Sequence, residues 1–146
     1  MSRLHPLAGL LAFALILSFW SATVTSELLG DAALIARVKI AIHWGLILLI
    51  PALALTGASG FRRARGRSLP LVAAKRRRMP VIALNGLCVL VPSALFLSAR
   101  AAAGTFDAAF YAVQALELAA GAVNLILIGL SARDGMRLTG RLGRPA

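Results

Sequence analysis

The fourth apolar segment of the chain carries the polar side chains best suited to chemistry inside a membrane. Gln114, Glu117, Gly121 and Asn124 recur at helical spacing, which places them on one face of a helix. A carboxylate within a membrane is costly unless it is paired or faces a cavity, so we expect this face to point toward other helices. Glu117 is therefore a candidate proton carrier or ion-pair partner, and Gly121 should let a neighbouring helix approach closely.

The second apolar segment begins with a cation and an imidazole at helical spacing, Lys39 and His43. Counted along the predicted helices, His43 and Glu117 both lie within about 15 Å of the same membrane boundary, so these two side chains could meet. Lys39 could reach Glu117 or Gln114, or extend to the headgroups.

A second polar pair is expected deeper in the membrane. Asn85 in the third segment and Asn124 in the fourth lie at similar depth, and a hydrogen bond between them would hold their helices together by roughly 0.6 to 2 kcal/mol.

His43 also raises haem b as a candidate cofactor, because histidine is a common axial ligand of haem. The second histidine, His5, lies about 20 Å away along the membrane normal, so the two cannot ligate one iron. A haem held by His43 alone stays open as an alternative. With two histidines and one cysteine, we expect no metal site of the usual ligand count, and no motif for nucleophilic catalysis is recognisable. We therefore expect no enzymatic activity.

Composition indicates the elements that must position these residues. Hydrophobic residues make up 60% of the chain and charged residues 14%, which is typical of a membrane protein. Four segments approach or exceed the roughly 20 residues that cross a bilayer as a helix. The sequence predicts an all-α, four-helix transmembrane bundle in a single domain, with helices near 6–26, 35–57, 80–100 and 107–131. The first segment also resembles a secretory signal, but we interpret it as a membrane helix.

The basic residues predict the orientation. Of the 16 Lys and Arg residues, all but Arg37, Lys39 and Arg100 fall on the side of the two termini and the 58–79 connection. This side is expected to be cytoplasmic in a bacterial inner membrane. The 58–79 loop should contact anionic lipid headgroups or the acidic face of a partner through Arg62, Arg63, Arg65, Arg67, Lys75, Arg76, Arg77 and Arg78. Nucleic acid is not an expected partner, because these residues lie between apolar segments.

The stretch "KRRRMPVIALNGLCVLVP", followed by "GTFDAAFYAVQALELAAGAVNLILIGLSARDGMRLTG", resembles small four-helix inner-membrane proteins of proteobacteria that have no assigned activity. The resemblance implies a location and a helix count. The chain lacks the paired intramembrane histidines of bis-histidine membrane cytochromes. It also differs from small multidrug transporters, whose membrane carboxylate is in the first helix, whereas Glu117 is in the fourth.

These observations lead to three functional hypotheses. The first is a non-catalytic accessory or partner-binding subunit that associates with another membrane protein or with a second copy of itself. The second is a haem b electron carrier that uses His43. The third is a proton-coupled transporter of a small solute that uses Glu117.

Overall fold

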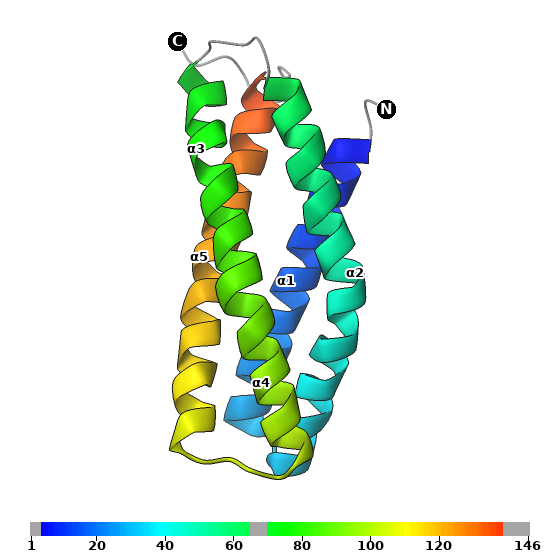
Figure 1. Ribbon diagram of the computed structural model, residues 1–146, viewed down its shortest axis with the longest axis vertical. Coiled ribbons are helices and arrows are strands. Elements are labelled where there is room, and N and C mark those ends of the chain that lie inside the picture. Colours follow the sequence, from blue (N-terminus) through cyan, green and yellow to red (C-terminus); the bar gives the residue numbers. More distant parts are fainter. Residues whose placement is uncertain (1–3, 65–69, 139–146) are drawn as a thin grey trace.

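The computed structural model describes residues 4–64 and 70–138, and their side chains over 6–59 and 77–137. The described chain is helical apart from two short connections. Its elements are α1 (Leu4–Leu29), α2 (Ala32–Ala64), α3 (Pro70–Asn85), the π-helical turn η1 (Gly86–Leu90), α4 (Val91–Ala102) and α5 (Ala108–Leu138). Because α3, η1 and α4 follow one another without a break, the described residues form four rods (Figure 1).

The structure confirms four helices that are long and apolar enough to cross a membrane. The qualifying stretches are Pro6–Leu29, Ala32–Ser59, Arg77–Ala102 and Ala108–Arg137. The start of α1 and the end of α5 lie at one end of the molecule (Figure 1). The connections from α1 to α2 and from α4 to α5 lie at the other end, which is called the turn end below.

The predicted basic loop is wrong in its extent. Residues 58–64 belong to the end of α2, and residues 70–79 belong to α3, so helix occupies most of the expected 58–79 connection. Hydropathy marks where a chain leaves the hydrocarbon, whereas alanine, arginine and lysine continue a helix readily in water. Helix α2 continues through Gly57, and Pro80 lies inside α3.

A widened turn interrupts the third rod beside a proline. The backbone N–H of Val91 donates to the carbonyl oxygen of Gly86, which is the bonding pattern of a π-helix. Pro92, at the start of α4, has no N–H to donate and its ring needs room against the preceding turn. The π-helical turn supplies that room without ending the rod.

The turn end is defined by helix caps. Gly104 has a positive φ of 66°, and its N–H donates to Ala101 O while the N–H of Thr105 donates to Arg100 O, a Schellman motif that ends α4. Asp107 Oδ1 then accepts the N–H of Phe110 at 3.0 Å and starts α5. Asp31 caps α2 in the same way, through the N–H of Leu34.

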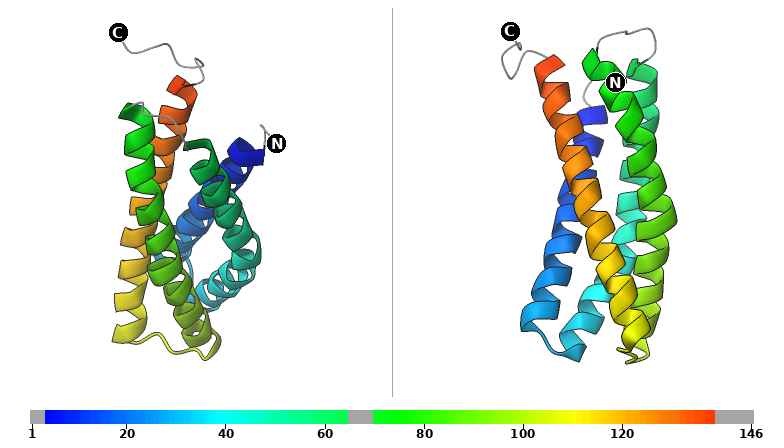
Figure 2. Two further views of the ribbon diagram at one scale, coloured as in Figure 1. Left: turned by 45° about the horizontal axis from the view of Figure 1, so that its top comes forward. Right: turned by 90° about the vertical axis from the view of Figure 1, so that its left-hand side faces the viewer.

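The four rods pack with α1 against α2 and α5, α2 against α1 and α4, and α3 against α5 (Figure 2). One apolar cluster joins α1, α2 and α4, and includes Ile16, Leu46 and Ala94. A smaller cluster at the turn end joins Ile35, Leu97 and Phe110. The polar side chains described next lie between these two clusters and on the inner face of α5.

Candidate functional site

A buried ion pair joins the second and fourth rods. Lys39 Nζ lies 2.6 Å from Glu117 Oε2, with side chains that are 1% and 12% exposed. The same ammonium donates to Thr23 Oγ1 at 3.3 Å, so a third helix, α1, contributes to its coordination. Lys39 does not extend to the headgroups, because its side chain turns inward to these two oxygens.

The polar face of α5 lies inside the molecule, as its spacing indicates. Gln114 and Asn124 are buried, and Gly121 is buried between them. A Cβ atom added at Gly121 would lie 3.0 Å from Trp20 Cδ1 of α1. The indole N–H of Trp20 donates to Leu118 O at 3.0 Å. Gly121 therefore permits the close approach of α1 and α5 that orients Glu117.

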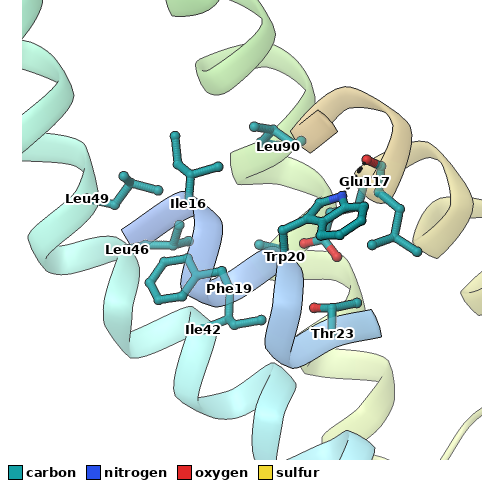
Figure 3. A pocket seen from close by; sticks show the side chains of 12 residues that line it. Ile16, Phe19, Trp20, Thr23, Ile42, Leu46, Leu49, Leu90 and Glu117 are labelled. Carbon is teal, nitrogen blue, oxygen red and sulfur yellow. Dashed lines mark hydrogen bonds between the residues drawn. The ribbon is translucent and has the colours of Figure 1, made fainter. Parts of the chain in front are cut away.

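A small cavity adjoins the ion pair. Its volume is about 50 Å³, and Thr23 and Glu117 lie on its wall. Figure 3 shows Thr23, Trp20 and Glu117 on one side and apolar side chains, among them Phe19 and Leu46, on the other. The cavity can hold a few water-sized groups, but it is much smaller than the roughly 300 to 1,000 Å³ of a usual ligand pocket.

Four buried polar atoms around the ion pair have no hydrogen-bond partner among the described residues. They are Glu27 Oε1, His43 Nδ1 and both amide atoms of Gln114. Glu27 is close enough to Lys39 and Glu117 to interact electrostatically with both. Unsatisfied polar atoms therefore occur on each of the three helices that contribute to the ion pair and its threonine contact.

His43 and Glu117 share no hydrogen bond among the described side chains. The expected contact between these two residues is not among the hydrogen bonds of the described chain, because Lys39, one turn nearer the turn end, takes the carboxylate instead. The His43 ring packs edge-on against Trp44, with ring centroids 5.7 Å apart.

His43 does not line either of two hollows in the described part of the chain. The cavity beside the ion pair is too small for a porphyrin, and the groove beside α4 and α5 is lined by Cys88 and Phe96 among others. No group of three or more His, Cys, Asp or Glu side chains within 4–64 and 70–138 is placed to hold a metal ion.

The two asparagines meet as their depth indicates. Asn85 Nδ2 donates to Asn124 Oδ1 at 2.9 Å and to the backbone oxygen of Ala120 at 2.8 Å. Asn124, which is fully buried, donates in turn to Ile82 O at 3.4 Å. This amide pair satisfies its own donors and joins α3 to α5, which is the structural role that amides have in membrane helices.

One residue of the basic segment is paired within the molecule. Arg78 Nη1 lies 2.6 Å from Asp134 Oδ2, and Asp134 is buried. Arg77 is exposed. Arg65 and Arg67 lie outside the described residues, and the side chains of Arg62, Arg63, Lys75 and Arg76, like that of His5, are outside the described side chains.

Sequence reasoning missed four contributors to these contacts: Trp20, Thr23, Glu27 and Asp134. A usable signal existed for the acidic ones, because the chain has only five Asp and Glu residues against 16 Lys and Arg. Each carboxylate in so basic a chain is a candidate ion-pair partner. No comparable signal marks Thr23 or Trp20, whose roles depend on which helix packs beside them.

Comparison with known proteins gives no family to which the chain can be assigned. No protein-family model, curated protein or solved structure matches it significantly.

Proposed function

We propose that the protein is a multi-pass protein of the bacterial inner membrane, a four-helix bundle with cytoplasmic termini, and a non-catalytic, partner-binding subunit of a membrane complex. The observation that carries this proposal is that polar groups on α5 bind side chains of the other helices. Glu117 binds α2, Asn124 binds α3, and Leu118 O binds Trp20 of α1. Each of these contacts holds two helices together.

The outer faces of the rods support the second half of the proposal. Large apolar side chains are exposed along them, including Trp44 at 64%, Ile47 and Ile126. Such faces require lipid or another membrane protein as their surroundings. The cavity beside the ion pair, at about 50 Å³, is small for a substrate, so protein contact is the function that we infer for these surfaces.

The partner-binding role is tested by photo-crosslinking at native abundance. A photoreactive residue is placed at exposed Trp44, Ile47 or Ile126, and a buried control is placed at Leu97. We expect a crosslinked product of one defined mass at an exposed site and none at Leu97. A defined product equal to two chains would identify a second copy as the partner. Crosslinks to lipid alone, together with a monomeric particle in native membrane discs, would contradict the proposal.

The orientation is supported by the concentration of Lys and Arg around the termini and in the 58–79 segment. Single-cysteine labelling in intact cells tests it, with a cysteine near Thr105 expected to react and one near the carboxyl terminus expected to be protected. Exposed Cys88 is first replaced by serine. Neutralising Arg62, Arg63, Arg65, Arg67 and Lys75 to Arg78 should perturb this pattern; unchanged labelling would remove the basic segment as the topological signal.

A further inference from the structure

All four unpartnered buried polar atoms of the described side chains lie within one helical turn of the ion pair or of the threonine that binds it. Gln114 precedes Glu117 by one turn on α5, and His43 follows Lys39 by one turn on α2. Glu27 follows Thr23 by one turn on α1. Unsatisfied polar atoms are rare in protein interiors, so Glu27 Oε1 and the Gln114 amide, each one turn from a residue of the ion-pair cluster on its turn-end side, indicate a group that they bind.

Lys39 supplies one positive charge to this cluster, and Glu117 is bound to it. With Glu27 and Glu117 both ionised, the cluster carries one excess negative charge. His43, one turn along α2 from Lys39, is the other titratable group on that stretch of α2, and α5 contributes Glu117. Arg100 of α4 is bound to Asp107 at 2.6 Å and is not available to the site. An excess charge in a membrane interior is costly unless a counter-ion neutralises it.

We propose that Glu27, Gln114 and Glu117, together with Thr23, form a binding site for one small monovalent cation, either Na⁺ or a proton. Gln114 is the second line of evidence beside the carboxylates, because its side chain is only 4% exposed and neither amide atom has a partner among the described residues. Oxygen ligands of this kind suit hard cations. One positive charge restores neutrality, whereas a divalent ion would leave the site with excess positive charge beside Lys39.

The directions of α1 and α5 indicate that a cation would enter the site from the turn end. Glu27 is near the end of α1, and Gln114 is one turn closer to the start of α5 than Glu117. Both residues therefore lie between the ion pair and the turn end. Glu27 is half-buried, so a cation arriving from the turn end would meet Glu27 before it reached Glu117. The inference does not depend on the partner-binding function proposed above.

Trp20 provides a local reporter for the test. Its indole donates to Leu118 O, one residue from Glu117, and lines the adjoining cavity. The full chain carrying Trp44→Phe is reconstituted in lipid discs, which leaves Trp20 as the single tryptophan. Its emission is titrated with NaCl against choline chloride at constant ionic strength, and separately with pH in sodium-free buffer. The test variant is Glu27→Gln, and the matched control is Asp31→Asn, at an exposed carboxylate four residues along the chain.

A saturable response to Na⁺ that weakens at least tenfold in Glu27→Gln, but not in Asp31→Asn, would identify a sodium site. A pH transition without a sodium response, lost in Glu27→Gln alone, would identify a proton site. A reporter that responds to neither cation, or that responds equally in both variants, would overturn the proposal.

A second measurement covers the case in which Glu27→Gln fails to fold. The thermal unfolding temperature of the unmodified protein is compared in sodium and choline salts at several pH values, since a ligand that binds the native state raises it. Gln114→Leu then serves as the test variant. We expect stabilisation by Na⁺ or by protons that Gln114→Leu reduces. Unfolding that is independent of both cations would exclude the site.

Discussion

Lys39 and Glu117, which are 78 residues apart in the sequence, form an ion pair of 2.6 Å between two helices that are long and apolar enough to cross a membrane. Burying either charge without the other would be costly. The pair therefore fixes how α2 faces α5, and it draws Thr23 of α1 to the same point.

Removing one partner of this pair should destabilise the protein by about 3 to 5 kcal/mol, because the remaining charge stays buried. Lys39→Met should lower the free energy of unfolding more than Glu117→Gln does. Lys39→Met leaves two carboxylates, Glu117 and Glu27, near each other, whereas Glu117→Gln leaves Lys39 with Glu27 as a nearby opposite charge. The double variant should be more stable than the sum of the two changes indicates. The free energy of unfolding in mixed micelles measures all three. Arg100→Met, at a half-exposed pair, is the control and should have little effect.

A strictly additive double variant would show that Lys39 and Glu117 act independently. The same cycle applied to His43 and Glu117 should give the smaller coupling, since the carboxylate is bound by Lys39.

Gly121→Ala should destabilise the protein by about 1 to 3 kcal/mol through overpacking against Trp20. The indole cannot move away freely, because its N–H is bound to Leu118 O. Gly129→Ala, on the same helix, is the matched control, since a Cβ there would meet nothing within 4 Å. We expect the control to be neutral or slightly stabilising, as alanine is the better helix former. Equal effects at the two glycines would contradict the close approach of α1.

The asparagine pair should contribute about 0.6 to 2 kcal/mol to the free energy of unfolding, and the loss of this free energy in Asn124→Ala measures the contribution. Asn85→Ala should cost a similar amount, and the double variant should cost less than the two together, because one hydrogen bond is shared. A double variant whose loss equals that sum would argue against the contact.

The start of α5 should become less stable in acid. The N–H of Phe110, which donates to Asp107, is the main cause holding the pKa of that carboxyl below its ordinary value, and the Arg100 guanidinium adds to it. A carboxyl with a lowered pKa in the folded protein stabilises it above the unfolded-state pKa. This stabilisation is lost as pH falls through the lower, folded-state value.

Amide hydrogen exchange at Phe110, corrected for its intrinsic pH dependence, measures this effect. Protection should fall in acid in the natural protein. In Asp107→Asn, whose side chain still accepts the N–H but does not titrate, protection should not follow pH. Protection that falls equally in both proteins would show that another group is responsible.

The sequence by itself determined that four apolar helices exist and which face of α5 is polar, because hydrophobic length and helical spacing are local properties. Asn85 and Asn124 could be paired from depth alone, since depth follows from counting residues along a helix. The sequence did not determine where the helices end, because Arg and Lys end an apolar stretch without ending the helix.

Only the tertiary structure decided which residue takes the Glu117 carboxylate. Lys39 and His43 lie one turn apart on the same face of α2, and counting residues does not separate them. The rotation of each helix about its axis and the direction of each side chain bring Lys39 Nζ to 2.6 Å from Glu117 Oε2. Glu27 and Thr23 belong to the site for the same reason. The position of a residue around its helix axis determines a contact only when the neighbouring helix is in place.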